Sequence, residues 1–278
     1  MTEAAPPLAG VIGWPVGHSR SPRLHGHWLA RYGIAGYYIP MAVPPGELAA
    51  ALAAQRQLGF RGTNVTIPHK EEALALASAA TAAAEVIGAA NTLVHLPEGG
   101  FRADNTDGVG FLANLRQGAP SWVPQGGPAL VLGAGGAARG VVWALLEAGV
   151  PEIRLANRSR ERAIALRDSF GPRVVAIDWA EAQDAVAGAA LIVNTTSVGM
   201  GGQGDPPVSL DRAESGALVT DIVYTPLVTP LLAAAQARGL ATVDGLGMLL
   251  HQAAPGFEAW FGRKPEVDAE LRAAVLAP

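Results

Sequence analysis

Cysteine is absent from this chain of 278 residues. Its absence excludes disulfide bonds, thiolate metal sites and cysteine nucleophiles, and it is typical of a protein that works in a reducing compartment. Charged side chains are also scarce, at 16% of the residues against about 25% in typical globular chains. Because 50% of the residues are hydrophobic, the composition predicts a well-buried globular protein rather than a disordered one.

Long apolar runs and basic clusters are missing as well. No stretch of about 18 residues is both apolar and free of charge, so we expect no transmembrane helix. Residues 1–7 carry no positive charge and no apolar core, so we expect no signal peptide and a cytoplasmic location. The net charge is −4 and the six tryptophans are scattered, which argues against a nucleic-acid partner. We assign no metal ligands.

Strand-like and helix-like segments alternate along both halves of the chain. This alternation predicts an α/β fold with mostly parallel sheets, and the length suits two domains. In the first half we expect strands at 8–13, 37–43 and 59–65 and a strand that begins at 91. In the second half we expect strands at 129–132, 153–156, 174–177, 191–194 and 218–221.

The helices are predicted from turn signals and composition. Ser21 and Pro22 open the first helix, with Ser21 as its cap. Further helices are expected at 47–58, from about Lys70 through the alanine-rich segment to Val86, and at 139–148. No strand follows the terminal helices at 248–261 and 267–276, so we expect them to pack on the first domain.

A segment rich in proline and glycine, 120–128, separates the two halves of the sequence. We therefore predict one domain from 1–113 plus 246–278 and another from 114–245.

A glycine-rich turn follows the strand at 129–132. Gly133-x-Gly135-x-x-Ala138 has the spacing of a dinucleotide fingerprint, in which the backbone approaches the pyrophosphate and a helix N-terminus faces it. The alternative is a tight turn without a ligand. The strand before the motif and the helix after it favour dinucleotide binding.

The end of the next strand indicates which dinucleotide is bound. Proteins that bind NAD place an acid there, whereas this chain has Asn157-Arg158-Ser159 followed by Arg162. A guanidinium suits a phosphate dianion, so the pattern favours NADP. The alternative is that both arginines are ordinary surface cations. Glu161 lies inside the following helix and is a poor ribose ligand.

Two turn-rich runs, around Lys70 and Asp107, carry the polar groups that a carbonyl reduction needs. Hydride delivery to a ketone leaves an alkoxide, which must take up a proton, and a lysine facing a carboxylate can supply it. Ser19 and Ser21 precede a helix and could bind a carboxylate, although simple capping by one serine explains them as well. Three histidines, His18, His25 and His69, lie in the same regions. We expect the first two to be structural and bonded to backbone, and the third to be a surface residue.

Polar residues also stand at or near the ends of predicted strands. Asn64, Thr66, Asn91 and Asp107 suit a substrate with several hydroxyls, and Gln252 on a terminal helix could add a contact. For each residue alone, turn chemistry is the alternative explanation.

These motifs together resemble the shikimate dehydrogenase family over nearly the whole chain. The runs that carry the resemblance are His18-Ser19-x-Ser21-Pro22, Asn64-Val65-Thr66-x-Pro68-x-Lys70, Gly88-Ala89-x-Asn91-Thr92, Asn105-Thr106-Asp107-Gly108, Gly133-Ala134-Gly135-Gly136-Ala137, Asn157-Arg158-Ser159, Asn194-Thr195-Thr196-Ser197-x-Gly199-Met200 and Asp244-Gly245-Leu246-Gly247-Met248-Leu249-x-x-Gln252. The chain departs from the family's usual pattern at Gly26, where Asn is common, and at Ala82, where many members carry an acid.

The resemblance implies a substrate-binding domain at 1–113 plus 246–278 and a Rossmann-type NADP domain at 114–245. It implies that Lys70 and Asp107 hold the reacting hydroxyl and that Lys70 carries the proton. For the rest of the site it implies three groups of residues. Ser19, Ser21 and Tyr224 bind the carboxylate, and Asn64, Thr66, Asn91 and Gln252 bind the ring hydroxyls. Gly133, Ala134, Gly135, Gly136 and Ala137 carry the pyrophosphate, Asn157, Arg158, Ser159 and Arg162 read the adenosine phosphate, and Ile222, Gly245 and Met248 lie beside the nicotinamide.

The implied activity is the reversible, NADPH-dependent reduction of 3-dehydroshikimate to shikimate in aromatic amino acid and chorismate biosynthesis. Two alternatives remain open. One is a quinate/shikimate dehydrogenase of dual specificity, and the other is an NADP-binding sensor without turnover. The sequence leaves both a monomer and a homodimer possible.

Overall fold

A computed structural model describes residues 5–202 and 204–277 of the chain. It divides into two compact units, Met1–Thr106 with Gln252–Pro278 and Asp107–His251. The segment 120–128 lies within the second unit, so it does not separate the two. The substrate-binding role predicted for 1–113 plus 246–278 stays a prediction, and so does the NADP-binding role predicted for 114–245. Among the described residues, no helix is both long and apolar enough to cross a membrane.

The first unit is built on a six-stranded sheet with the strand order β2-β1-β3-β5-β6-β4. Its strands are β1 (Leu8–Gly13), β2 (Tyr37–Ala42), β3 (Phe60–Val65), β4 (Ala79–Ala80), β5 (Thr92–His95) and β6 (Phe101–Asp104). The pairings of β1 with β2, β1 with β3 and β4 with β6 are parallel. The pairings of β5 with β3 and β6 are antiparallel, so this sheet is mixed, with parallel pairings in the majority.

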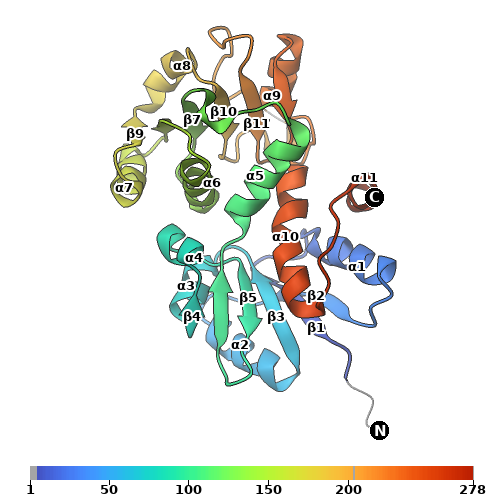
Figure 1. Cartoon of the computed structure of the whole chain (residues 1–278). Helices are drawn as coiled ribbons and strands as arrows, with labels where there is room; N and C mark the ends of the chain where they lie inside the picture. The colour runs from blue at the N-terminus through green and yellow to red at the C-terminus, as the bar shows by residue number, and fades with distance from the viewer. Residues whose placement is uncertain (1–4, 203, 278) are drawn as a thin grey trace. The chain divides into compact units, whose positions relative to one another are not determined.

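The helices of this unit are α1 (Ser21–Arg31), α2 (Leu48–Gln57), α3 (Lys70–Ala75), α4 (Ala82–Ile87) and α11 (Ala269–Leu276), with the end of α10 (Leu246–Phe261). Figure 1 shows α11 beside α1, which bears out the expectation that the chain's end packs on the first unit. The alanine-rich segment is not one helix, because β4 interrupts it before Thr81 caps α4 through its hydroxyl. Gly88 ends α4 in the left-handed region, at φ 73°.

Helix α1 differs from its prediction at its first turn. Arg20 occupies the cap position without a side-chain hydrogen bond, and Ser21 is the first helical residue. Ser21 is therefore not the cap, and its hydroxyl is not used by the helix end. Leu24, His25 and Trp28 fall on one face by helical spacing, and all three are buried.

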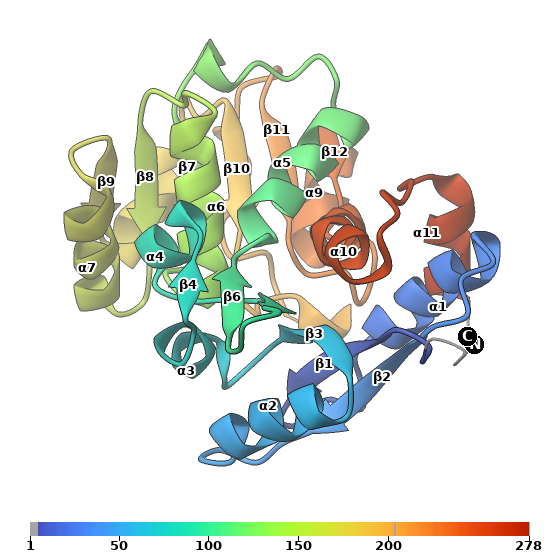
Figure 2. The same ribbon diagram turned by 60° about the horizontal axis from the view of Figure 1, so that its bottom comes forward.

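The second unit contains a fully parallel six-stranded sheet in the order β12-β11-β10-β7-β8-β9, which Figure 2 shows. Its strands are β7 (Ala129–Leu132), β8 (Ile153–Ala156), β9 (Val174–Ile177), β10 (Leu191–Asn194), β11 (Leu218–Asp221) and β12 (Ala241–Val243). The first five coincide with their predicted ranges, and β12 was not predicted. The helices are α5 (Asp107–Gly118), α6 (Gly136–Glu147), α7 (Arg160–Phe170), α8 (Ala182–Ala185) and α9 (Pro230–Ala237), with short 3-10 turns at Pro124–Gly126, Trp179–Glu181 and Met200–Gly202.

Both faces of this parallel sheet are covered by helices. Along β7, Val131 packs with α5, α6 and α7, whereas its neighbours Leu130 and Leu132 pack with α8 and α9. Successive side chains of a strand point to opposite faces, so a strand buried on both sides must be apolar throughout. This is why the short apolar runs predicted the strands well.

We expect Gly62→Ala to destabilise the first unit. A methyl group there would run into the Leu93 carbonyl oxygen and Trp260 Nε1, which are bonded to each other at 2.9 Å between β5 and α10. Overpacking of this kind costs about 1–3 kcal/mol of unfolding free energy. Gly26→Ala is the matched control. It lies inside α1 with no atom within 4 Å of the added methyl, so it should stabilise by about 0.5–1 kcal/mol. Equal melting temperatures for the two variants, measured by circular dichroism, would contradict this packing.

Candidate active site

A chain of buried hydrogen bonds crosses the first unit from β2 to β5. The Tyr38 hydroxyl donates to Asn64 Oδ1 at 2.7 Å. Asn64 Nδ2 in turn lies 3.1 Å from both the Asn91 carbonyl oxygen and Thr92 Oγ1. The amide of Asn64 is thus fixed in orientation by partners on two other segments. This network joins two of the predicted substrate-binding residues, Asn64 and Asn91, directly.

Asn91 is the junction of this network. Its Oδ1 accepts from Thr92 Oγ1 at 3.0 Å and from the Thr106 backbone N–H at 2.9 Å. Its Nδ2 donates to Gln252 Oε1 at 3.2 Å, and Thr106 Oγ1 donates to the Gln252 carbonyl oxygen at 2.8 Å. The segments of Asn91, Thr106 and Gln252 are therefore joined by hydrogen bonds. Gln252 is the third residue of this network that the sequence predicts to bind substrate, after Asn64 and Asn91.

Tyr38 and Thr106 were missed as members of this site. Thr106 stands in the quoted run Asn105-Thr106-Asp107-Gly108, so its position could have drawn attention to it. Tyr38 lies inside a strand with no flanking motif, and nothing in the sequence singles it out. Burial raises the pKa of Tyr38 well above its ordinary value, and a hydrogen bond with the Ser21 side chain opposes the shift. Tyr38 therefore stands between Ser21 and Asn64.

The remaining residues predicted to bind substrate in this unit are more exposed. Ser19 is half-buried, and its Oγ accepts from the Ser21 backbone N–H at 3.3 Å. Thr66 follows β3, and its backbone N–H donates to the Ile12 carbonyl oxygen at 2.8 Å. The half-buried Lys70 begins α3. Its carbonyl oxygen accepts from the Ala90 N–H at 2.8 Å, which fixes the backbone that carries its ammonium.

The three histidines behave differently from one another. His18 is exposed and its side chain has no hydrogen bond among the described residues, so the expectation that it is structural and bonded to backbone was wrong. His69 is 1% exposed, so the expectation of a surface histidine was wrong, and its Nε2 lies 2.7 Å from the Val43 carbonyl oxygen. His25 is structural but not bonded to backbone. It stacks on Tyr38 with ring centroids 3.8 Å apart, and neither ring nitrogen has a hydrogen-bond partner of normal geometry.

The fingerprint turn of the second unit is shaped for a close ligand. Gly133 has φ 109°, and a Cβ there would come within 2.6 Å of Thr195 Oγ1. Gly135 and Gly136 have no atom within 4 Å of an added Cβ, and the N-terminus of α6 has no side-chain cap. The free N–H groups of this 12-residue helix can therefore face a pyrophosphate.

The position of this turn in the sheet agrees with its shape. The chain order reverses between β7 and β10, and Gly133 and Thr195 follow the carboxyl ends of these two strands. Ligands of open α/β sheets bind at such a switch point. The neighbouring Ala134 N–H donates to Asn157 Oδ1 at 3.1 Å, and Asn157 Nδ2 donates to the Ser159 carbonyl oxygen at 2.9 Å. Asn157 thus holds two loops of the predicted cofactor site together.

Two of the arginines after β8 have their guanidinium groups open to solvent. Arg158 and Arg162 are exposed, and neither side chain makes a hydrogen bond or ion pair within residues 5–202 and 204–277. The intervening Arg160 differs, because its Nη1 lies 2.9 Å from Asp178 Oδ2. The segment therefore presents two guanidinium groups that no acid of the described residues pairs, as a site for a phosphate dianion requires.

A buried carboxylate that the sequence did not reveal supports the loop of Ile222 and Tyr224. Asp221 accepts from Asn194 Nδ2 at 3.0 Å, from the Val223 N–H at 2.9 Å and from Thr229 Oγ1 at 2.7 Å. Burial raises the pKa of Asp221, while these three hydrogen bonds oppose the shift.

Three more residues predicted for the site belong to this unit, namely Gly245, Met248 and Asp107. Any Cβ at Gly245 would meet the Ile222 carbonyl oxygen, so only glycine allows that backbone approach. Met248 is packed in the core at 9% exposed. Asp107, the first residue of α5, is 8% exposed. Among the described residues, no group of three or more His, Asp or Glu could hold a metal ion.

Three protein-family models match the chain. The model described as shikimate dehydrogenase substrate binding domain matches residues 11–93. The model described as shikimate / quinate 5-dehydrogenase matches 124–246, and the one described as shikimate 5'-dehydrogenase C-terminal domain matches 245–274.

Known proteins resemble the chain over nearly its whole length. The shikimate dehydrogenase (NADP(+)) of Paracoccus denitrificans is 63% identical over 273 residues, which cover 98% of this chain and 96% of that protein. The structure of shikimate 5-dehydrogenase from Thermus thermophilus in complex with NADP(H) and shikimate is 39% identical, with a TM-score of 0.86 over 96% of this chain and 98% of that one. The structure of quinate dehydrogenase from Corynebacterium glutamicum in complex with NAD is 32% identical, with a TM-score of 0.90 over 98% and 99%.

We expect His25 to make the protein less stable in acid. Burial lowers the pKa of His25 to about 3, and the nearby Asn64 offsets only part of this shift. The unfolded chain takes up the proton near pH 6.5, so the contribution of His25 is complete above that value and falls as the pH drops towards 3. The loss is up to about 1.4 kcal/mol per pH unit in that window.

His25→Phe should flatten the slope of unfolding free energy against pH, measured by urea unfolding between pH 4 and 7. A phenyl ring keeps the stack on Tyr38 and cannot take up a proton. His18→Gln, which removes an exposed histidine, is the control and should keep the original slope. An unchanged slope in His25→Phe would show that other groups govern the acid response.

Proposed function

This chain belongs to the shikimate dehydrogenase family, and from that premise we propose that it interconverts 3-dehydroshikimate and shikimate with NADP(H) in aromatic amino acid and chorismate biosynthesis. The observation that carries the proposal is 63% identity over 98% of the chain to a shikimate dehydrogenase (NADP(+)). Two features of the structure support it independently. The polar network offers hydrogen-bonding groups for a polyhydroxylated substrate, and the fingerprint turn offers backbone N–H groups for a pyrophosphate.

The proposed substrate site consists of the polar network and its more exposed neighbours. Asn64, Asn91 and Gln252 carry amides, which suit ring hydroxyls, and the Thr66 hydroxyl adds a fourth group. Their mutual hydrogen bonds fix the amides before substrate arrives, which lowers the entropic cost of binding. We assign the substrate carboxylate to the hydroxyls of Ser19 and Ser21, with Tyr224.

Tyr38 acts as a positioning residue in this proposal. Its hydroxyl lies between the Ser21 side chain and Asn64 Oδ1, so one buried group orients both the carboxylate side and the hydroxyl side of the site. His25 holds the Tyr38 ring by stacking on it.

The proton in the proposed reaction comes from Lys70. When hydride reaches the ketone carbon, the carbonyl oxygen becomes an alkoxide and takes a proton from the Lys70 ammonium. The amine that remains recovers a proton from solvent, and the reverse reaction runs the same steps backwards. Asp107 keeps Lys70 charged and holds the reacting hydroxyl. A positioned proton transfer of this kind is worth roughly 10²- to 10⁴-fold in rate.

The proposed cofactor is NADP, which supplies or accepts the hydride when bound. Gly133, Ala134, Gly135, Gly136 and Ala137 suit the pyrophosphate, because the turn leaves backbone N–H groups open at the start of α6. Arg158 and Arg162, with Asn157 and Ser159, suit the 2′-phosphate. Ile222, Gly245 and Met248 are assigned to the nicotinamide side.

A dual quinate/shikimate dehydrogenase is the second candidate. A quinate dehydrogenase in complex with NAD matches this fold with a TM-score of 0.90, and one matching family model covers both substrates. Quinate carries an extra hydroxyl on the carbon that bears the carboxylate, so the space beside Ser19, Ser21 and Tyr224 decides between the two. The NADP-binding sensor, the cytoplasmic location, and the choice between monomer and homodimer stay predictions.

An initial-rate assay that follows reduced nicotinamide tests the proposed function. It crosses shikimate and quinate with NADP and NAD on the purified protein. We expect turnover mainly with shikimate and NADP. Comparable rates with quinate or NAD would favour the dual-specificity candidate, and cofactor binding without turnover of either substrate would favour the sensor.

Lys70→Ala should lower kcat at least about a hundredfold and leave shikimate affinity nearly unchanged, because the variant lacks only the proton carrier. The chain has one other lysine, the exposed Lys264, so Lys264→Ala is the matched control and should keep full turnover. Initial rates and equilibrium binding of shikimate measure the two effects separately. A large loss of affinity with kcat intact would overturn the assignment of Lys70 as the proton carrier.

Arg158→Ala should weaken NADP binding about ten- to a hundredfold and change NAD binding little, since NAD lacks the 2′-phosphate. The expected loss corresponds to a charge-assisted hydrogen bond of about 1.5–3 kcal/mol. Arg160→Ala is the control, because that guanidinium is already paired with Asp178. Titration of both dinucleotides by calorimetry measures the four affinities. Equal weakening of NADP and NAD by Arg158→Ala would argue against phosphate recognition.

A further inference from the structure

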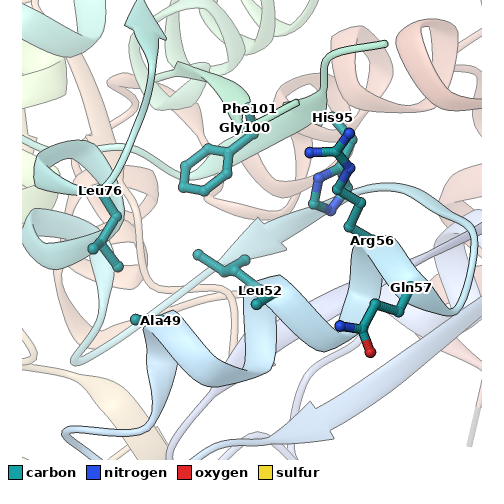
Figure 3. Close-up of a pocket in the computed structure, with 9 residues that line it drawn as sticks. Ala49, Leu52, Arg56, Gln57, Leu76, His95, Gly100 and Phe101 are labelled. Carbon is teal, nitrogen blue, oxygen red and sulfur yellow. The ribbon is translucent and has the colours of Figure 1, made fainter. Parts of the chain in front are cut away.

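A pocket lies within the first unit, apart from the polar network. It has a volume of about 610 Å³ and is formed by α2, the end of α3 and the hairpin of β5 and β6 (Figure 3). None of the residues assigned to substrate or cofactor lines it. The pocket therefore needs an explanation of its own, independent of the proposed function.

The lining is divided into an apolar part and a polar part. Figure 3 shows Leu52, Leu76 and Phe101 grouped on one side, with Arg56 and His95 together on the other. Leu76 is 40% exposed although it is a large apolar side chain. No acidic residue lines the pocket. This division suits a molecule that is apolar at one end and anionic at the other.

The polar side of the pocket has hydrogen-bonding capacity that the described residues do not use. Arg56 reaches across to the hairpin turn at Gly99, yet its guanidinium has no hydrogen bond or ion pair within residues 5–202 and 204–277. Both ring nitrogens of His95 are buried without a hydrogen-bond partner of normal geometry. The Gly100 backbone is the group that the ring faces within the protein. The exposed guanidinium of Arg56 is therefore the group on this side that can take a partner from solvent.

Electrostatics fix the sign of that partner. Burial lowers the pKa of His95, the Gly100 backbone opposes this shift, and the positive charge of Arg56 lowers the pKa further. The imidazole is therefore neutral at pH 7, and Arg56 supplies the positive charge on this side of the pocket. A guanidinium that no acid pairs suits a carboxylate.

We propose that this pocket is a second ligand site, which binds a small amphiphilic carboxylate with its carboxylate on Arg56 and its apolar body against Leu52, Leu76 and Phe101. The affinity of such a ligand is modest, because the pocket is open to solvent on one side and buries only part of the molecule. For a ligand of about 14 non-hydrogen atoms we expect a Kd of about 1 mM or somewhat lower.

Calorimetric titration of the full-length protein with 2-naphthylacetate, and with the neutral 2-naphthaleneethanol, tests the proposal. The acid should bind at least about tenfold more tightly than the alcohol. Arg56→Gln should remove this preference and leave the affinity for the alcohol nearly unchanged. Arg61→Gln, an exposed arginine that does not line the pocket, is the matched control and should behave like the unmodified chain.

Two further measurements separate this pocket from the proposed active site. Binding of 2-naphthylacetate should persist with saturating shikimate and NADP, and Ala53→Phe should weaken binding of both probes. Ala53 is an exposed helix residue that lines the pocket, so the larger ring fills it without disturbing the core. No binding, equal affinity for acid and alcohol, an unchanged preference in Arg56→Gln, or full displacement by shikimate would each overturn the proposal.

Discussion

The amide of Asn91 is the constraint on which the proposed substrate site depends. Its two polar atoms bind the residue that follows it, the Thr106 backbone and the Gln252 side chain, so one amide joins β5, the end of β6 and α10. A buried amide with every partner in place is rigid, because any rotation leaves a donor or acceptor unsatisfied at a cost of about 1–3 kcal/mol. The folding of the first unit thus aligns these three segments, and no further ordering is needed to bring them together.

The predicted dinucleotide site of the second unit has a different requirement. Its turn must leave backbone N–H groups uncovered by side chains, so residues outside the turn must fix its conformation. Asn157 does this by accepting from Ala134 and donating to the Ser159 carbonyl. Asp221 plays the equivalent part for the loop of Ile222, since it accepts three hydrogen bonds while buried. Asn157 binds only backbone groups, whereas Asp221 binds the Val223 N–H and the side chains of Asn194 and Thr229.

The sequence predicted the second unit better than the first for a physical reason. A parallel strand buried on both faces is a short apolar run between turns, and β7 is the clearest case, with four apolar residues that are all buried. The runs of β8 to β11 are mostly apolar, whereas β12 is too short and too exposed to stand out. In the first unit β4 spans only Ala79–Ala80 within an alanine-rich segment, so composition alone suggests continuous helix. Site residues near strand ends were recognisable, because polar groups there contrast with the apolar runs. Tyr38 was not, since an aromatic residue in a strand is ordinary, and its role depends on Ser21 and Asn64 arriving from other elements.

The two ends of the hairpin formed by β5 and β6 differ in how completely their polar side chains are hydrogen-bonded. Thr92 pairs with Asp104 at one end and His95 with Phe101 at the other, three residues or about 10 Å away. At the first end the polar side chains of the Asn91 network have partners within the protein. At the second end the His95 ring nitrogens have no hydrogen bond of normal geometry, and the Arg56 guanidinium has no partner among the described residues. The fold itself therefore satisfies the polar groups at the Asn91 end, whereas at the other end an unpaired guanidinium stands beside apolar side chains of the pocket. A bound carboxylate would give that guanidinium the partner that the fold does not supply.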